Sequence, residues 1–228
     1  KSVEALKALS AAGLSRIHIG LETGCDELLS YMKKGTTAQE HITAGRKVKE
    51  SGISLSEYII LGLGGKEWSK KHAIDTAEVL NQIDPDFIRV RTLSVRPDSP
   101  LRLRVESNEF FRLSEEDVVK EERLLIERLE GIQSYYASDH MLNLLMEVNG
   151  KFPEDKNKML ATIDRYLELP APEKLNFSVG RRLGYYYQLD DMLNEDRYSR
   201  VKDRIEKINA GRPEGVEANI TAWMEKMI

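Results

Sequence analysis

Two stretches of the sequence carry side chains that suit the binding of a polar ligand. The first, "RIHIGLETGCDELLSYMKKG" (16–35), places Glu22 at the end of an alternating apolar run and continues into a short helix that ends in Lys33 and Lys34. The second, "SEYIILGLGG" (56–65), ends an apolar run in glycines. Parallel α/β folds bind ligands where their strands end. Both stretches therefore predict cofactor-facing ends of barrel strands.

Helix-like and strand-like segments alternate through the first hundred residues and would position these side chains. Strands are expected at 16–21, 53–61 and 87–93. Helices are expected at 2–12, 26–34, 37–52 and 69–83, with Thr37 as the N-cap of the third. Connections of this length join parallel strands through right-handed crossovers. The predicted fold class is α/β.

One face of each expected strand is polar, although parallel strands are normally apolar on both faces. Alternate side chains of a strand share a face. The polar face carries His18, Gly20 and Glu22 on the first strand, Ser54, Ser56, Tyr58 and Ile60 on the second, and Arg89 and Arg91 on the third. Such faces suit a barrel whose lumen holds a polar ligand, and the alternative is plain exposure to solvent. Glu57 is expected on the opposite face, pointing outward.

Beyond residue 112 the sequence reads as a separate helical domain, 113–228, which follows a half-barrel of residues 1–112. Ser114 is expected to cap a long amphipathic helix, with Asp117 three residues later. Further helices are expected at 138–148, 153–169, 183–194, 198–210 and 213–226. The proline-rich stretch "ELPAPEKLNF" (168–177) is the expected hinge within this half.

Composition excludes several classes of protein. The net charge of −4 argues against binding that is driven by nucleic-acid or anionic membrane charge. The single cysteine, Cys25, excludes an intramolecular disulfide and is expected to be an ordinary buried thiol. The four histidines show no metal-ligand spacing, so no metal ligand is assigned. The sequence shows no membrane-length apolar run and no signal peptide, which predicts a cytoplasmic protein.

The segments 12–65 and 86–101 together resemble the second half of a radical S-adenosylmethionine (SAM) domain. The similarity is to the branch that includes oxygen-independent coproporphyrinogen oxidases and the elongator catalytic subunit. The family fold is a partial (β/α)6 barrel, and the resemblance matches the three expected parallel strands to its fourth, fifth and sixth strands. The family's CxxxCxxC segment, which holds a [4Fe–4S] cluster, is absent from this sequence.

The resemblance implies part of an Fe–S oxidoreductase that uses SAM and a [4Fe–4S] cluster to generate a 5′-deoxyadenosyl radical. The substrate is not implied, and the reductant would be a flavodoxin or a ferredoxin. The chain alone is expected to be inactive and to hold no metal, since it lacks the cluster cysteines. The alternative is a non-catalytic α/β plus helical module that binds a nucleotide or a protein.

Unpaired strand edges bind other chains readily. The half-barrel is therefore expected to be stabilised by the helical domain, by self-association, or by further residues of the same protein. Neither a membrane nor nucleic acid is expected as a partner.

The resemblance also implies roles for two charged residues. Glu22 would accept hydrogen bonds from the ribose hydroxyls of SAM, and the alternative is an exposed carboxylate at a strand end. Lys34, twelve residues later, would pair with the SAM carboxylate. Lys33 is an equal candidate for that position, and the alternative for both lysines is a solvated helix end.

The second and third strands would complete the cofactor site. Ile60 would give an apolar contact to the adenine, and Gly62 would let the backbone approach the ring. The alternative for this stretch is a plain turn from strand to helix. Arg91 would bind SAM or a substrate acid, or would form an internal salt bridge to Glu22 or Glu57.

Overall fold

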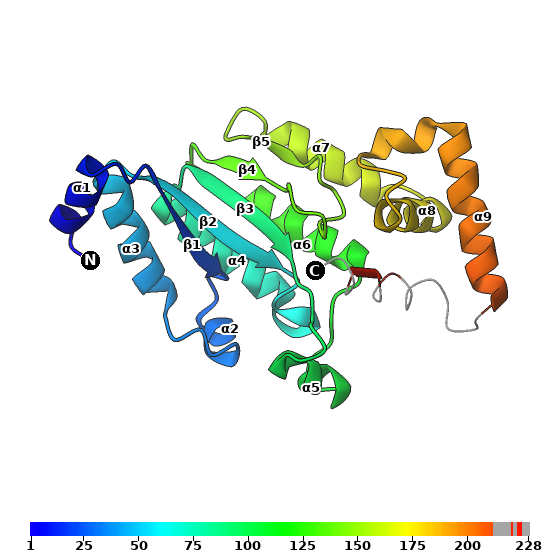
Figure 1. Cartoon of the computed structure of the whole chain (residues 1–228), viewed down its shortest axis with the longest axis horizontal. Helices are drawn as coiled ribbons and strands as arrows, with labels where there is room; N and C mark the ends of the chain where they lie inside the picture. Colours follow the sequence, from blue (N-terminus) through cyan, green and yellow to red (C-terminus); the bar gives the residue numbers. More distant parts are fainter. Residues whose placement is uncertain (212–219, 221–222, 225–228) are drawn as a thin grey trace.

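The computed structural model describes residues 1–211, 220 and 223–224, and its centre is a five-stranded sheet (Figure 1). The strand order is β1-β2-β3-β4-β5, with β1 to β4 parallel and β5 antiparallel to β4. The strands are β1 (Arg16–Glu22), β2 (Ser54–Leu61), β3 (Phe87–Thr92), β4 (Tyr135–Ala137) and β5 (Asn149–Lys151). The α/β class and the three parallel strands expected from the sequence are confirmed, and β4 and β5 extend the sheet.

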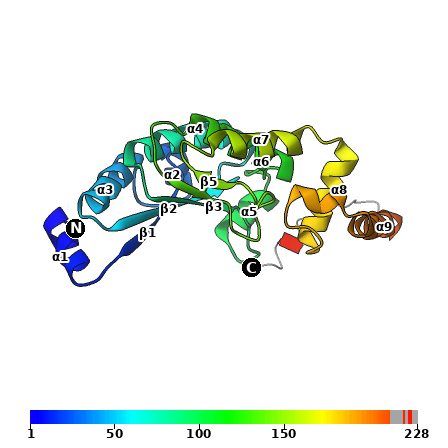
Figure 2. The same ribbon diagram turned by 90° about the horizontal axis from the view of Figure 1, so that it is seen from above.

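Helices connect the strands and continue beyond them. They are α1 (Val3–Ala11), α2 (Asp26–Tyr31), α3 (Ala38–Glu50), α4 (Gly65–Ile83), α5 (Pro100–Glu106), α6 (Glu115–Arg128), α7 (Lys156–Leu167), α8 (Ala171–Arg182), the short 3₁₀ helix η1 (Leu189–Leu193) and α9 (Glu195–Gly211). Figure 2 shows α3, α4, α6 and α7 on one side of the sheet. Thr37 and Ser114 are N-caps, as their positions in the sequence predicted.

The main core lies between the sheet and these helices. Leu55 and Ile59 of β2 and Ile88 and Val90 of β3 are fully buried on this side, where they join one apolar cluster with α4 and α6. The other side of the sheet is called the open face below. There Arg16 and His18 are exposed, while Tyr58, Arg89 and Arg91 are partly exposed. The polar face expected from the sequence is thus present and reached by solvent, and its role as a barrel lumen stays a prediction.

The helix expected at 138–148 is wrong, because long-range hydrogen bonds hold this segment as a loop between β4 and β5. Asn143 Nδ2 donates to Val90 O at 3.0 Å and to Ser138 Oγ at 3.0 Å. Arg181 donates to the carbonyl groups of Asn143 and Leu144. These partners lie far away in the sequence, so local periodicity could not reveal them.

The stretch 168–177 is mostly helical, because α8 begins at Ala171 and prolines fit the first turn of a helix. The hinge expected within this stretch stays a prediction. The helix expected at 183–194 is wrong: it is reduced to η1, since Gly184 adopts a φ of +76° two residues after the end of α8. Helix α5 was not expected. The helix expected at 213–226 falls mostly outside the described residues.

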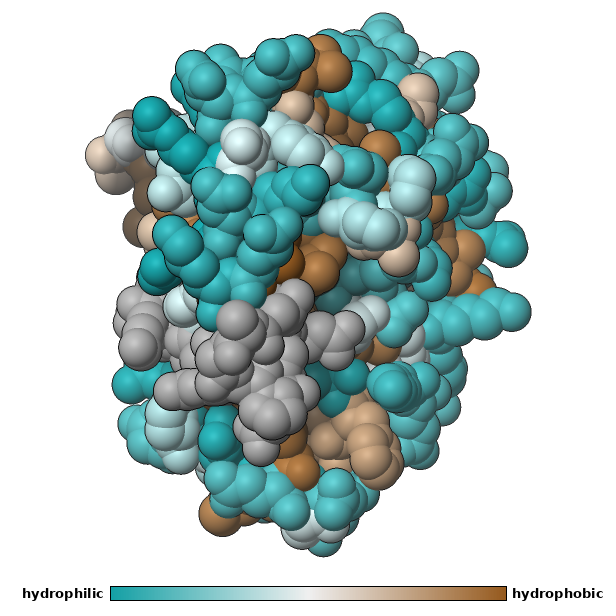
Figure 3. Space-filling view, turned by 90° about the vertical axis from the view of Figure 1, so that its right-hand side faces the viewer, coloured by the Kyte–Doolittle hydropathy of each residue, from teal (hydrophilic) through white to brown (hydrophobic). Residues whose placement is uncertain are grey.

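The sheet takes strands from both sides of residue 113, so the division of the chain at that residue stays a prediction about separate folding. The end of the molecule that carries α8 and α9 is mostly hydrophilic where described residues are visible, with small hydrophobic patches (Figure 3). Among the described residues, no helix is both long enough and apolar enough to cross a membrane.

Candidate functional site

The carboxyl ends of β1, β2 and β3 bring the predicted site residues to neighbouring positions. Gly20 pairs with Tyr58, and Tyr58 with Arg89. One step further along the strands, Ile60 pairs with Arg91. A register shift after Gly20 places Glu22 opposite Ile59, and Glu22 itself has a φ of +63°. Glu22, Ile60 and Arg91 thus lie at the carboxyl ends of three neighbouring strands.

Glu22 and Lys34 form an ion pair with 2.5 Å between Oε1 and Nζ. Their side chains are 30% and 28% exposed, so solvent reaches the pair. Gly20 leaves room for it, since a Cβ there would lie 3.2 Å from Glu22 Oε1 and 3.4 Å from Lys34 Nζ. Of the two candidate lysines, the structure therefore brings Lys34 to Glu22.

Ile60 lies against a second apolar cluster at the end of β2. Its buried members are Cys25, Leu28 and Leu63, and its partly buried members are Tyr31, Met32, Ile60, Trp68 and Leu93. Gly62 follows with a φ of +79°, a backbone conformation that glycine adopts without strain. Its N–H donates to Glu121 Oε1 of α6 at 2.6 Å, so α6 fixes the turn after β2.

Helix α4 ties the ends of β1 and β2 together through His72. Its Nδ1 lies 2.8 Å from Thr23 Oγ1 and its Nε2 lies 3.1 Å from Ile60 O. A carbonyl oxygen only accepts, so Nε2 carries the proton and Nδ1 accepts from the threonine hydroxyl. Burial lowers the pKa of His72 to about 4, so the ring is neutral at pH 7. Its role is to hold the ends of β1 and β2 against α4.

The glycine that follows Glu22 and Thr23 allows β1 to end directly on α4. Gly24 N–H donates to Thr76 Oγ1 at 2.9 Å. A Cβ on Gly24 would lie 2.4 Å from Asp75 O, which is backbone and cannot move aside easily. Close approach between two backbones therefore explains this glycine.

Sequence reasoning missed Glu121 and His72 as parts of the site's scaffold. Glu121 is buried and also accepts a hydrogen bond from Ser69 Oγ at 2.5 Å. Burial raises the pKa of Glu121 to about 7. A glutamate within a strongly charged helix is normally exposed, so the sequence carried no signal for this contact.

Arg91 lies on the open face and pairs with neither Glu22 nor Glu57. Its Nη1 lies 3.2 Å from Asp139 Oδ1, and its Cζ lies 4.8 Å from the centre of the Tyr58 ring. The internal salt bridge expected as its alternative role exists, but its partner is Asp139. Glu57 points to the helix-covered side, away from Tyr58 as expected, and is fully buried.

A cavity of about 520 Å³ opens beside the ends of β2 and β3. Residues from the loop after β3, the start of α6 and helix α8 line it, and Gly62 is the one of the five predicted site residues that does so. Within its wall, Arg182 pairs with Glu115, and Lys174 lies 3.2 Å from Glu116. The size is typical of a small-molecule pocket.

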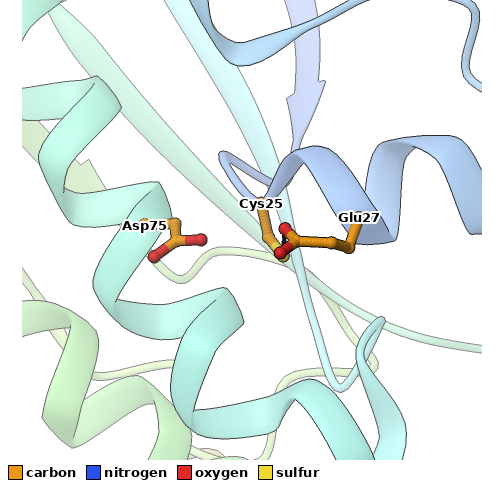
Figure 4. A group of neighbouring side chains, drawn as sticks. All are labelled: Cys25, Glu27 and Asp75. Carbon is orange, nitrogen blue, oxygen red and sulfur yellow. Dashed lines mark hydrogen bonds between the residues drawn. The ribbon is translucent and has the colours of Figure 1, made fainter.

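Cys25, Glu27 and Asp75 place possible metal-ligand atoms within 4.8 Å of one another (Figure 4). Burial raises the pKa of Cys25 to about 11, so the thiol keeps its proton at pH 7, whereas metals bind the thiolate. Lys71 Nζ already lies 2.8 Å from Asp75 and 3.4 Å from Glu27. The Lys71 ammonium group thus lies where a metal ion would bind, and we assign no metal site to Cys25, Glu27 and Asp75.

Comparison with known proteins identifies the segment of the chain that carries Glu22, Lys34, Ile60 and Gly62. Residues 2–78 match the family model described as the Radical SAM superfamily. The resemblance found in the sequence is therefore confirmed for this segment, which contains β1, β2 and most of α4. Members of this superfamily use SAM and a [4Fe–4S] cluster.

The similarity to individual proteins is below 30% identity. The chain is 29% identical over 150 residues to a tRNA-2-methylthio-N(6)-dimethylallyladenosine synthase of Marinomonas sp. (strain MWYL1), which covers 64% of this chain and 32% of that protein. It is 24% identical over 110 residues to the tRNA uridine(34) acetyltransferase of Methanocaldococcus jannaschii, covering 47% and 20%. A solved structure of Methanocaldococcus infernus Elp3 superposes with a TM-score of 0.47 at 18% identity, covering 54% and 29%. The chain spans about a third of the length of the synthase.

Proposed function

We propose that this chain forms part of a radical SAM enzyme and holds SAM at the carboxyl ends of β1, β2 and β3. The observation that carries the proposal is the placement of Glu22, Ile60 and Arg91 on three adjacent strand ends, within or next to the matching segment 2–78. Strand ends of parallel folds are where cofactors bind.

The chemistry of this edge fits SAM. The Glu22 carboxylate can accept from ribose hydroxyls, and the Lys34 ammonium can pair with the SAM carboxylate. Both groups are partly exposed, and they are paired with each other. A ligand with hydroxyls and a carboxylate would replace this ion pair by two contacts, one to Glu22 and one to Lys34. Ile60 offers an apolar wall for the adenine, and the turn at Gly62 is held by Glu121. When bound, SAM supplies a 5′-deoxyadenosyl group.

The residues of this chain do not fit an iron–sulfur cluster. Such a cluster needs several cysteine thiolates, and the one cysteine here is buried and protonated at pH 7. No reaction step is derived through a cluster on these residues, and we propose that the chain alone is inactive. In the complete enzyme, the cluster would be held by other residues and reduced by a flavodoxin or a ferredoxin.

Nucleic acid is included among the proposed partners. The expectation against nucleic acid rested on the net charge of the chain alone. Both curated relatives described above are named for reactions on tRNA, which runs against that expectation. The proposed substrate class therefore includes a group carried by RNA, and the cavity beside Gly62 is the proposed place for the reacting group.

Calorimetric titration of the complete, cluster-loaded protein with SAM tests the proposal. Glu22→Ala should weaken SAM binding by about 1–3 kcal/mol, because it leaves the ribose hydroxyls of bound SAM without their acceptor. Glu50→Ala, at an exposed end of α3, is the matched control and should leave the dissociation constant unchanged. An unchanged constant for Glu22→Ala would remove this carboxylate from the site.

A further inference from the structure

The open face of the sheet carries two arginines that share one carboxylate. Arg89 Nη1 lies 2.7 Å from Asp139 Oδ2, and Arg91 Nη1 lies 3.2 Å from Asp139 Oδ1. We call Arg89, Arg91 and Asp139 the arginine cluster. Asp139 comes from the loop after β4, so the contact joins this loop to β3. One carboxylate neutralises one of two guanidinium charges, and a positive charge remains in a chain whose net charge is −4.

The cluster leaves hydrogen-bond donors without acceptors. Arg91 Nη1 also donates to Val90 O at 2.9 Å, and within the described part of the chain these hydrogen bonds use the Nη1 groups and neither Nη2 group. Arg89 Nε is buried and has no acceptor among the described residues. The arginine side chains are 24% and 25% exposed, so a ligand can reach them from solvent.

Aromatic contacts fix the position of the cluster before a ligand binds. The Arg91 guanidinium lies over the Tyr58 ring, which in turn contacts the His18 ring at 5.7 Å between centroids. Stacking of this kind holds the plane of a guanidinium group. Glu22, the carboxylate at the end of β1, is paired with Lys34 and forms no salt bridge with either arginine.

We propose that the arginine cluster binds an oxyanion of the substrate, either a carboxylate or a phosphate. Guanidinium groups recognise both through paired hydrogen bonds. Asp139 keeps the two arginines side by side in the free protein, and the ligand's oxyanion binds the unused Nη2 edges. That the ligand is a substrate rests on the proposed function, whereas the anion site belongs to this chain by itself.

Titration of the chain with pyrophosphate and with citrate at low ionic strength tests the anion site. Arg89→Gln should weaken binding about tenfold, because it removes a charge-assisted donor. Asp139→Asn should tighten binding about threefold or more, because it removes a competing negative charge and keeps the side-chain shape. Arg46→Gln, which removes an exposed arginine of α3 that donates to Gln82 O, is the control and should leave the affinity unchanged.

Equal affinity of the parent chain and Arg89→Gln would overturn the proposal, as would weaker binding by a folded Asp139→Asn chain. If the arginine cluster had only a structural role, anion binding would weaken in both Arg89→Gln and Asp139→Asn. A second titration, of the complete protein with SAM, separates the two sources of a carboxylate. Arg89→Gln should change SAM affinity by less than about twofold, because Arg89 is not among the residues that we propose for SAM. An equal loss for SAM and pyrophosphate would assign the cluster to the cofactor and overturn the substrate assignment.

Discussion

Glu57 shows what a single residue contributes to the behaviour of the core. It lies on the helix-covered side of β2 between buried apolar neighbours, and no hydrogen bond of standard geometry reaches either oxygen among the described residues. Burial raises the pKa of Glu57 to about 8, and the Leu21 backbone offsets a small part of this shift. A buried carboxylate without a partner is stable only in its protonated form.

The free energy of unfolding should therefore depend on pH through Glu57. Its pKa is higher in the folded chain than in the unfolded chain, so its contribution is complete at about pH 4 and is lost as the pH rises through about 8. Glu57→Gln should be the more stable form at pH 8 by about 1–3 kcal/mol. Urea unfolding of both forms at several pH values measures this, with exposed Glu50→Gln as the control. A stability difference that does not change with pH would contradict it.

At the scale of elements, α4 and α6 position the ends of β1 and β2. His72 and Thr76 of α4 hold Thr23, Gly24 and Ile60, while Glu121 of α6 holds Gly62. The predicted cofactor residues lie on turns that two helices fix from behind. Small changes in this packing should therefore act on both the fold and the site.

The two glycines around Glu22 should respond differently to a methyl group. Gly24→Ala should destabilise the chain by about 1–3 kcal/mol, because the new Cβ would overlap the backbone of α4. Gly20→Ala should cost less than about 1 kcal/mol, since its Cβ would meet only the ends of the flexible side chains of Glu22 and Lys34. Thermal unfolding of both variants decides the matter, and equal losses would show that the approach of β1 to α4 has been misjudged.

Local sequence patterns predicted the strands and helices of the first hundred residues well, because strand alternation, helical periodicity and the Thr37 cap are all local signals. The parallel strands predicted from these patterns place Ile60 next to Arg91, and Glu22 pairs with Lys34 at the end of the adjacent strand. They could not predict the loop 138–148, which depends on Asn143 and Arg181, nor the buried contacts of His72 and Glu121. In each of these cases the partner lies on another element, and spacing along the chain carries no record of it.

At the scale of the whole molecule, the sheet depends on residues from both halves of the chain. Val119, Leu125 and Ile126 of α6 and Tyr136 of β4 are buried in the same apolar cluster as β2 and β3. Residues 1–112 alone would expose this apolar surface and one more strand edge.

A fragment of residues 1–112 should therefore lack a cooperative unfolding transition, whereas a fragment of residues 1–151 should regain part of it. Circular dichroism on heating distinguishes the two, with the full chain as the reference. A native-like transition for 1–112 would show that the first half folds by itself and would support the division at residue 113.

Hydrogen–deuterium exchange of the complete, cluster-loaded protein, with and without SAM, tests the central claim most directly. If SAM lies at the ends of β1, β2 and β3, its presence should slow exchange of the backbone amides at 20–24, 33–35 and 60–65. The exposed surface of α9 should show no change, because it lies at the opposite end of the molecule from β1 (Figure 1). Protection elsewhere, with exchange at these three segments unchanged under saturating SAM, would contradict the account.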